Sequence, residues 1–242
     1  MKSFALTDVG CKRDLNQDTV YMTDQKCGAL PNLYIVADGM GGQNAGDYAS
    51  VRTVEVVLEE VAQSSNLSQP VSIFEQAIQK ANAIIYEEAN RDLTKNGMGT
   101  TIVMASVIGN HLFVGNVGDS RLYVAGKTKL TQITRDHSVV AELVRNGELD
   151  AKDAKSDKRK NMITRAVGAE KTVNVDYFDV TLKGYERVLL CSDGLTNMVD
   201  DRDILSVLGS TDTIENKATR LVELANNNGG RDNVSAIVIE PF

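Results

Sequence analysis

The sequence has little cysteine and proline and no long apolar run. It holds three cysteines and three prolines among 242 residues, and no apolar stretch approaches the ~20 residues that a membrane-spanning helix needs. Three cysteines at unrelated spacings form neither a disulfide framework nor a zinc site. The N-terminal residues contain no apolar segment like that of a signal peptide. We therefore expect a cytoplasmic protein that does not insert into membranes.

Positive charge is also scarce. Lys and Arg number 26 against 33 Asp and Glu, which gives a net charge of −7. Because nucleic-acid binding rests on Lys and Arg that neutralise phosphates, we expect no nucleic-acid partner. A chain of this length can bury roughly 70% of its unfolded surface, and no repeat, linker or change in composition divides it. We expect a single domain over residues 1–242, and a monomer.

Apolar periodicity predicts both helices and strands. Apolar residues at steps of three and four predict helices over residues 45–62, 74–93, 138–146 and 214–227. Ser72 and Glu75 have the spacing of a capping box ahead of the second helix. β-Branched runs joined by turns such as IGNH and AGKT are typical of antiparallel hairpins. The expected strands are 3–7, 19–23, 33–37, 100–107, 111–117, 121–125, 129–134, 173–181, 187–191 and 233–240. The pattern predicts an α+β protein, a β-sandwich with helices outside it.

Aspartates stand at the ends of several expected strands, most of them beside glycine. They are Asp18, Asp38, Asp119, Asp193 and Asp232. Carboxylates that flank core strands would lie together at one edge of the sheets, where they would repel one another unless a cation sat among them. A glycine carbonyl oxygen could serve as a further ligand. Because all these ligands are oxygen, the site should prefer Mg²⁺, Mn²⁺ or Ca²⁺ to zinc.

The number and spacing of residues exclude other kinds of phosphate-binding or phosphate-cleaving site. The two histidines, His111 and His137, are too few for a histidine-rich dinuclear site. We expect His111 to pack within its strand and His137 to support a ligand or cap a helix. A cysteine-based phosphatase needs an arginine six positions after the cysteine, and no cysteine here has one. The glycine-rich stretch after Asp38 has Asp47 where a phosphate-binding loop needs Lys, and Asn44 where a dinucleotide-binding pattern needs Gly.

Arg13 lies in the loop that leads to the second expected strand. It precedes Asp18 by five residues, so it could reach a phosphate held by metal ions near that carboxylate. A planar guanidinium can bind two phosphate oxygens at once. We therefore expect Arg13 to bind phosphate.

Seven motifs occur together in one order along the chain: RDLNQD, VADGMGG, GTT, VGDSRLY, TRDHS, CSDGLTN and GGRDNVS. In order and approximate spacing, this set resembles the metal-dependent, type-2C Ser/Thr protein phosphatases of the PPM family, bacterial branch. The resemblance covers essentially the whole chain. It implies a central β-sandwich of two antiparallel sheets flanked by pairs of α-helices, in agreement with the pattern above.

The resemblance also implies the ligands of two Mn²⁺ or Mg²⁺ ions. Asp38 would bridge both ions, and the Gly39 carbonyl would bind the second. Asp193 and Asp232 would hold the first ion, and Asp18 would reach the second through water.

Two further implications concern a third ion and the phosphate. Asp119, together with Asp193, resembles the third-metal ligands of bacterial members, and Arg13 resembles the phosphate-binding arginine. Gln17 and Met40 depart from many eukaryotic relatives, which have glutamate and histidine at these positions. Methionine cannot donate a proton, so the leaving oxygen must take its proton from elsewhere.

Residues 147–161 fall where the family has a variable flap beside the active site. Between Asp150 and Asn161 this segment has five basic and three acidic residues. It could be a solvated face, or it could contact phosphoprotein substrates, with Lys158 and Arg159 as the candidate contacts. A loop swap that leaves substrate preference unchanged would exclude the second hypothesis.

The expected function is that of a metal-dependent protein serine/threonine phosphatase. It would hydrolyse phosphomonoesters on phosphoproteins by attack of a water or hydroxide that bridges two divalent metals. The family implies a cognate Ser/Thr protein kinase as a partner. The alternatives are a non-catalytic, metal-containing module that binds phosphoproteins, and a metal-dependent phosphodiesterase or nuclease, which the acidic balance disfavours.

Overall fold

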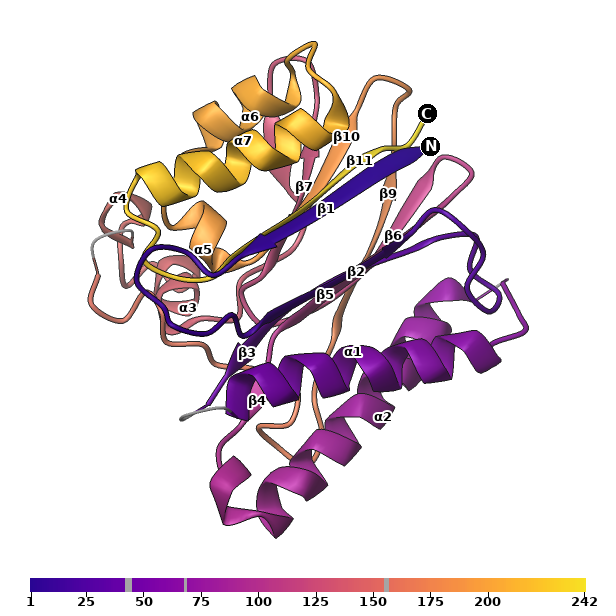
Figure 1. Ribbon diagram of the computed structural model, residues 1–242, viewed down its shortest axis with the longest axis vertical. Coiled ribbons are helices and arrows are strands. Elements are labelled where there is room, and N and C mark those ends of the chain that lie inside the picture. The colour runs from indigo at the N-terminus through magenta and orange to yellow at the C-terminus, as the bar shows by residue number, and fades with distance from the viewer. Residues whose placement is uncertain (42–44, 68, 155–156) are drawn as a thin grey trace.

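Two antiparallel sheets pack face to face, and helices cover the outer face of each sheet (Figure 1). The structure, a computed structural model, describes residues 1–41, 45–67, 69–154 and 157–242. The predicted α+β architecture, a sandwich of two antiparallel sheets between pairs of helices, is confirmed. The two chain ends lie side by side because β1 (Lys2–Asp8) pairs with β11 (Val234–Glu240).

Each sheet mixes strands from distant parts of the chain. The first sheet has the order β1-β11-β10-β7-β8, where β10 is Arg187–Cys191, β7 is Arg121–Ala125 and β8 is Leu130–Gln132. The second has the order β2-β3-β5-β6-β9, with strands Asp18–Thr23, Leu33–Met40, Ile102–Ile108, His111–Val117 and Asp176–Thr181. A short β4 (Gly99–Thr100) pairs with the end of β3. The predicted hairpins β5–β6 and β7–β8 are confirmed.

The strand β3 is buried on both faces, as its unbroken apolar run predicts. Tyr34 and Val36 point into the layer between the sheets, where they join Leu190 and Ile237 of the first sheet. Because side chains alternate along a strand, Ile35 points the other way and packs beneath the helices. The position of β3 at the centre of the molecule fixes Asp38, near its end, at the edge between the two sheets.

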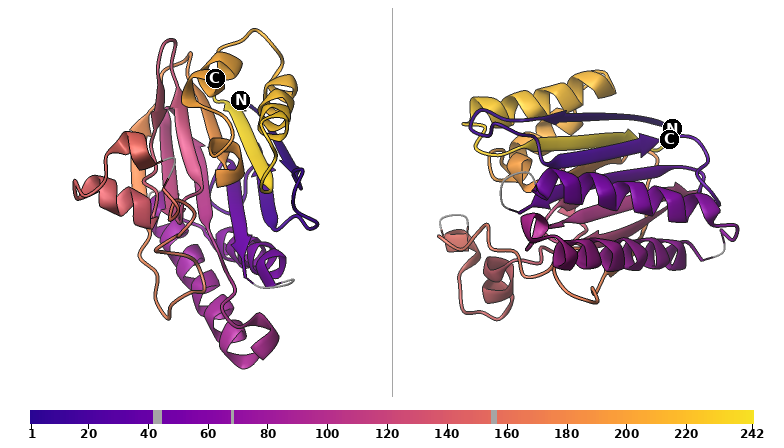
Figure 2. Two further views of the ribbon diagram at one scale, coloured as in Figure 1. Left: turned by 90° about the vertical axis from the view of Figure 1, so that its left-hand side faces the viewer. Right: turned by 60° about the horizontal axis from the view of Figure 1, so that its bottom comes forward.

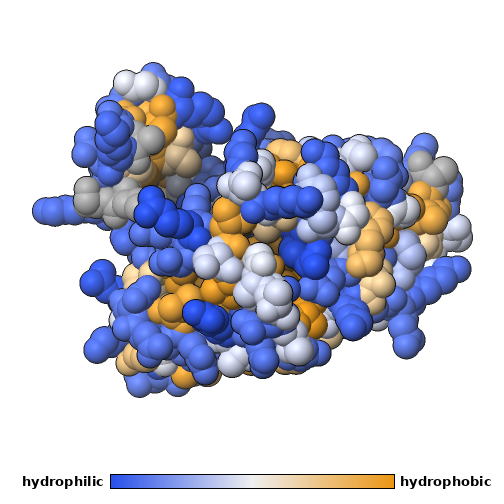
Figure 3. Space-filling view, turned by 90° about the horizontal axis from the view of Figure 1, so that it is seen from above, coloured by the Kyte–Doolittle hydropathy of each residue, from blue (hydrophilic) through white to orange (hydrophobic). Residues whose placement is uncertain are grey.

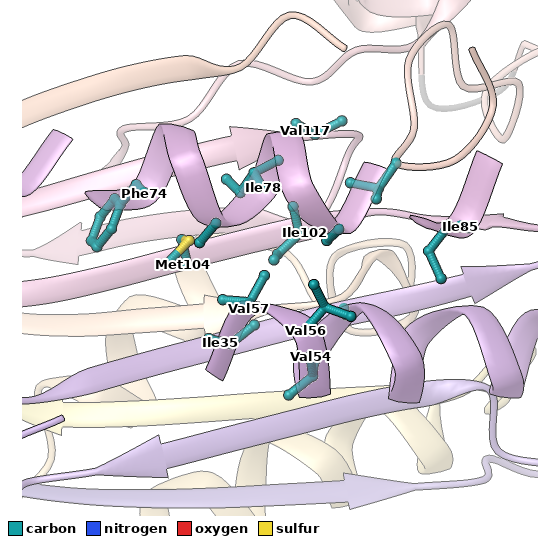
Figure 4. Close-up of a cluster of buried hydrophobic side chains, with 14 of the residues drawn as sticks. Ile35, Val54, Val56, Val57, Phe74, Ile78, Ile85, Ile102, Met104 and Val117 are labelled. Atoms are coloured by element: carbon teal, nitrogen blue, oxygen red, sulfur yellow. The ribbon is translucent and has the colours of Figure 1, made fainter. Parts of the chain in front are cut away.

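Two long helices, α1 (Ala45–Gln63) and α2 (Pro70–Arg91), cover the second sheet. Figure 4 shows Val57 of α1 and Ile78 of α2 meeting Ile102 and Met104 of β5 in one cluster of buried side chains. The absence of a side chain at Gly115 in β6 lets α2 come close, since a Cβ there would lie 3.3 Å from the Phe74 ring.

The first sheet is covered by α6 (Asp201–Leu208) and α7 (Ile214–Asn227). Leu221 and Ala225 of α7 pack with Ile204 of α6 and with Leu189 of β10 in a second buried cluster. The short elements α3 (Val139–Arg145), α4 (Ala151–Ala154), α5 (Asp193–Thr196) and the 3₁₀ helix Leu93–Lys95 complete the described structure. In both views of Figure 2 the segment that includes α3 and α4 stands out from the body of the molecule.

Several boundaries differ from those predicted. The capping box at Ser72 was wrong: α2 begins at Pro70 with Gln69 as its N-cap, because proline suits the first turn, where its missing N–H costs nothing. The expected strand over 100–107 is interrupted at Thr101. The pattern also missed α6, whose eight residues are too few for clear periodicity.

The surface carries mostly polar side chains. The face in Figure 3 is mainly hydrophilic, with smaller apolar areas between. His111 lies in β6 and its ring stacks on that of Phe113, with 6.1 Å between the ring centroids; its side chain is 45% exposed and its Nδ1 lies 2.8 Å from Asp179 Oδ1. None of the helices within the described ranges combines the length and the apolar character needed to cross a membrane.

Candidate active site

The register of the strands brings the predicted aspartates to one edge of the sandwich. Asp18 begins β2 and lies directly opposite Asp38 of β3 in the antiparallel pair. Asp193 follows the end of β10, and Asp232 precedes the start of β11, the strand beside it. Since the end of one antiparallel strand meets the start of the next, the two members of each pair lie close together, and Asp38, Asp193 and Asp232 of the two sheets line one pocket. Asp119 follows the end of β6.

Most of the predicted residues line one pocket with a volume of about 230 Å³. They are Arg13, Asp38, Gly39, Asp119, Asp193 and Asp232. Asp18 lies behind this pocket instead of on its wall, and the flap residues Lys158 and Arg159 do not line it. Gln17 and Met40 do line it. The structure therefore gathers four carboxylates and one guanidinium from five distant segments of the chain.

Burial and mutual repulsion raise the pKa of the clustered carboxyl groups. The pKa of Asp38 is raised well above its usual value. The main cause is loss of solvent, followed by the charges of Asp18, Asp193, Asp119 and Asp232. Loss of solvent is also the main reason why the pKa of Asp119 rises to about 8, that of Asp18 to about 7 and that of Asp193 to about 6. The cluster is costly to ionise by itself and would be relieved by positive charge.

Asp18 is held by two serines that sequence reasoning missed. Its Oδ2 accepts hydrogen bonds from the hydroxyls of Ser192 (2.7 Å), directly after the end of β10, and Ser235 (2.6 Å), in the neighbouring strand β11. Its buried Oδ1 has no hydrogen-bond partner among the described residues. The possible signal was a serine directly before the aspartate in CSDG and a second one early in the final strand.

Threonines fix the backbone at Asp38. The Thr101 hydroxyl accepts from the Asp38 amide at 3.0 Å, and the Thr101 amide donates to the Asp38 carbonyl at 2.9 Å. The Thr100 hydroxyl donates to the same carbonyl at 2.9 Å. Thr101 also shares a hydrogen bond of 2.7 Å with the hydroxyl of Ser120, next to Asp119. The break in the strand at Thr101 thus ties two of the pocket carboxylates to one polar junction.

Close backbone packing explains the glycine that follows Asp38. A Cβ at Gly39 would lie 1.9 Å from the carbonyl oxygen of Gly46 in the first turn of α1. A Cβ at Gly46 would in turn lie 2.7 Å from Nε2 of Gln17 and 2.8 Å from the carbonyl oxygen of Gly39. Glycine at both positions is therefore required for the end of β3, the start of α1 and the Gln17 side chain to come this close together.

Asn233 joins the loop that carries Arg13 to the start of β11. Its Nδ2 donates to the carbonyls of Val9 (2.9 Å) and Leu15 (3.0 Å), and its Oδ1 accepts from the Gln17 amide at 2.8 Å. Sequence reasoning did not single out Asn233, although it stands next to Asp232 in the last motif. Its three hydrogen bonds hold the loop at the rim of the pocket.

Arg13 reaches into the pocket from this loop. Its Nη2 lies 2.8 Å from Oδ2 of Asp232, and its side chain is 52% exposed. The hydrogen bond and charge of Asp232, together with the charges of Asp38 and Asp193, raise the pKa of Arg13. Asp193 is held differently, since Nδ2 of Asn197 donates to its Oδ2 at 2.9 Å. The guanidinium therefore stands at the mouth of the cluster and is always charged.

His137 supports the turn before Asp119 and does not cap a helix. Ser138 is the N-cap of α3, so the capping role expected for His137 was wrong. His137 Nδ1 accepts from the Gly118 amide at 3.0 Å, and its Nε2 lies 2.9 Å from Nη1 of Arg165 and 3.3 Å from Asp176 Oδ2. Burial, followed by the charge of Arg165, lowers the pKa of His137. The neutral ring is thus part of the support for Asp119.

The end of the flap and the residues after it reach the pocket that Arg13 also lines. Asn161 and Ile163, neither of them predicted, line the pocket from this side. Lys158 is exposed. Arg159 donates hydrogen bonds to the Asp157 carboxylate, from Nε to Oδ1 at 3.0 Å and from Nη2 to Oδ2 at 2.8 Å. Lys155, counted among the basic residues of the flap, and Gly42 of the VADGMGG motif lie outside the described residues.

The pocket has the donor set of a site for hard cations. Its carboxylates and carbonyls are all oxygen ligands, and the orphaned Oδ1 of Asp18 behind it is a further acceptor. Over the ranges that the structure describes, no three acidic, histidine or cysteine side chains converge on one ion, and Asp232 is turned toward Arg13. An ion in this pocket would draw its ligands from these carboxylates together with carbonyl and water oxygens, and Asp232 would have to turn from Arg13 to reach it. The residues present fit a divalent cation.

Comparison with known proteins agrees with the site. The family model described as Protein phosphatase 2C matches residues 19–234. The serine/threonine phosphatase stp of Listeria monocytogenes is 39% identical over 239 residues, covering 97% of this chain and 93% of its own length.

Two solved structures are similar over nearly all of the chain. The serine/threonine phosphatase of S. agalactiae has a TM-score of 0.91 and 37% identity, with 98% of each chain covered. The catalytic domain of the serine/threonine protein phosphatase PstP, in complex with two manganese ions, has a TM-score of 0.85 and 32% identity, covering 98% of this chain and 96% of that one. From its motifs, its fold and these relatives, this chain belongs to the protein phosphatase 2C family, in its bacterial branch.

Proposed function

We propose that this protein is a metal-dependent serine/threonine phosphatase that hydrolyses phosphomonoesters on phosphoproteins. The observation that carries the proposal is the single pocket that holds Asp38, Asp119, Asp193, Asp232 and Arg13 in a chain of this family. Relatives with 34–39% identity over nearly the whole chain carry the name of serine/threonine or protein phosphatase. The non-catalytic binding module has no such support.

The proposed ligands are those that the family resemblance implied. Asp38 would serve two ions, with Asp193 and Asp232 on the first and the Gly39 carbonyl on the second. Manganese or magnesium is proposed because the donors are hard oxygens and because the related PstP structure contains two manganese ions. Asp18 is proposed to act on the second ion through water.

A third ion is proposed at Asp119 and Asp193. His137 supports this proposal, because it holds the amide of Gly118 and so fixes the turn on which Asp119 stands. The Asn197 amide does the same for Asp193. Both carboxylates are therefore held in place by groups that are not ligands themselves.

Two divalent ions supply an activated water near neutral pH and neutralise charge on the phosphoryl oxygens. Uncatalysed phosphate-monoester hydrolysis is slow enough that enzymes accelerate it up to ~10²¹-fold. One arginine on a transferring phosphoryl group contributes ~10³–10⁵-fold. Arg13 is therefore a binding and orienting group, and the metal cluster must supply the larger part of the acceleration.

The chain's own residues bind and orient the phosphoester. Arg13, at the rim, offers its planar donors to two phosphate oxygens. Its bond to Asp232 Oδ2 holds the guanidinium toward the pocket. Met40 lines the pocket with a thioether that has no exchangeable proton, so it shapes the pocket and does not protonate the leaving oxygen.

Hydrolysis of two substrates under metal control tests the proposal. With Mn²⁺, the protein should hydrolyse para-nitrophenyl phosphate and a phosphoserine peptide, and excess EDTA should abolish both activities. Asp38→Asn should lose activity in Mn²⁺ while its circular dichroism stays that of the parent protein. Phosphopeptide hydrolysis that persists in EDTA, or a preference for phosphodiesters, would contradict it.

The wider assignments are proposals as well. We propose that residues 1–242 act as one catalytic domain with a flap at 147–161, which is supported by the pairing of the first and last strands. A cognate Ser/Thr protein kinase is proposed because phosphoprotein substrates require an enzyme that makes them. We propose a cytoplasmic monomer, in keeping with three free cysteines. Light scattering after size-exclusion chromatography tests the monomer.

A further inference from the structure

A second cavity lies beside the candidate active site, under the flap. Its volume is about 630 Å³, within the range of sites that bind small ligands. We call it the flap groove. Val140 and Val144 of α3 form an apolar wall, and Arg135, Lys160, Asn197 and Asp201 are among its polar groups. The proposed phosphatase chemistry gives this groove no task.

The flap groove lies next to the active pocket, and neighbouring residues line the two cavities. Lys160 lines the groove and the next residue, Asn161, lines the pocket. Asn197 also lines the groove and donates a hydrogen bond of 2.9 Å to Asp193 in the pocket. Consecutive Cα atoms lie about 3.8 Å apart, so at this point about one residue separates the two cavities. A polypeptide whose phosphorylated side chain enters the pocket can therefore continue into the groove.

The charges of the groove distinguish it from the rest of the surface. Arg121 at its floor is neutralised by Asp136 through bonds of 3.0 and 2.6 Å. Arg135 and Lys160 form no ion pair among the residues that the structure describes, although the charge of Lys160 also acts to lower the pKa of Asp193 in the pocket, and Asp201 adds one negative charge. The protein as a whole has a net charge of −7. Two unpaired cations beside the pocket of an acidic protein favour an anionic ligand segment.

We propose that the flap groove binds the polypeptide on one side of the phosphorylated residue and selects substrates with an acidic residue nearby in sequence. This inference rests on the proposed function. An extended chain advances about 3.3–3.6 Å per residue, so the acidic residue should stand about two to four positions from the phosphorylated one. Its carboxylate would meet Arg135 and Lys160, and an apolar neighbour would pack on Val140 and Val144.

Matched phosphopeptides test the proposal. Two phosphoserine peptides carry glutamates two to four positions away, one on the N-terminal and one on the C-terminal side, and each has a glutamine analogue. The wild-type protein with Mn²⁺ should favour one acidic peptide over its analogue about three- to tenfold in kcat/KM, the range of two partly exposed ion pairs. Because such pairs are screened, the preference should shrink as NaCl is raised.

Two charge reversals locate the effect. Arg135→Glu changes a groove residue in the loop before α3, and Arg145→Glu makes the same change of charge at the exposed last residue of α3, outside the groove. Arg135→Glu should abolish or invert the preference, and Arg145→Glu should keep it. Both variants should hydrolyse para-nitrophenyl phosphate within about twofold of the parent protein, because neither residue lines the active pocket.

The outcomes separate this inference from the proposed function. Hydrolysis of every substrate without an acidic preference, or an equal loss of preference in both variants, overturns the groove inference alone. If no substrate is hydrolysed with Mn²⁺, the proposed function fails and the inference fails with it. Arg135→Gln is a second groove variant, with a smaller charge change, and should reduce the preference without inverting it.

Discussion

Raising the pH of the metal-free protein from about 6.5 to about 8 should lower its thermal stability. The pKa of Asp18 is raised to about 7 and that of Asp119 to about 8, in both cases mainly by burial. In the unfolded chain both groups ionise near pH ~4. The folded protein therefore holds protons that the unfolded chain releases. A raised carboxyl pKa leaves stability complete below the unfolded value and removes it as pH rises through the folded value.

The size of the effect follows from the number of protons held. In the folded state Asp18 and Asp119 together hold about 1.7 protons at pH 6.5 and about 0.6 at pH 8, and each held proton changes the free energy of unfolding by about 1.4 kcal/mol per pH unit. The slope should therefore decrease from about 2.4 to about 0.8 kcal/mol per pH unit across this range. For a chain of this size, 1 kcal/mol shifts Tm by about 2–4 °C. The Tm should thus fall by about 2–10 °C per pH unit.

Thermal melts followed by circular dichroism in EDTA measure the slope. Asp119→Asn removes one titrating group and should reduce the slope by about half. Glu59→Gln, at an exposed position of α1, should leave it unchanged. Excess Mn²⁺ should remove the slope and raise the Tm, because bound cations keep the carboxylates ionised and an ion at 100 times its Kd adds about 2.7 kcal/mol. A metal-free Tm that stays level or rises with pH would refute the electrostatic account of the cluster.

Three further predictions concern single residues. Arg13→Ala should lower kcat/KM for para-nitrophenyl phosphate about 10- to 100-fold, mainly by raising KM, because the phosphate loses its hydrogen bonds to a charged group. An equal loss of Mn²⁺ affinity would show that the arginine is structural. The pKa of His137 should lie below 6.5 when followed by NMR, because burial disfavours the charged form of the ring. The stabilising contribution of the neutral ring is therefore lost only as pH falls below 6.5. A titration midpoint above 6.5 would contradict this. Asn82→Ala should lower the free energy of unfolding by about 1–3 kcal/mol, because it leaves the buried Gly168 amide without its 2.8 Å hydrogen-bond partner. The control Asn90→Ala, at an exposed position, should lower it by less than about 0.5 kcal/mol. Urea titrations measure both values, and equal losses would contradict the prediction.

The sequence alone determined the composition of the site. Asp38, Asp193 and Asp232 each stand at the end of a strand whose apolar run can be recognised locally, and glycine follows Asp38 because Gly39 meets the backbone of Gly46. Such signals depend on a few neighbouring residues. The two long helices were predictable for the same reason, since periodicity over four or more turns is a local property.

Only the tertiary structure decided which groups support the site and what lies beside it. Ser192 and Ser235 meet Asp18 because β10 and β11 are neighbours in the sheet, although 43 positions separate the two serines. The pairing of Arg13 with Asp232 spans 219 positions. A long-range contact depends on strand order and register, which no local pattern encodes. The flap groove likewise exists only because residues of β7, β8 and α3 come together around one cavity, and that is why the sequence predicted a site but not its surroundings.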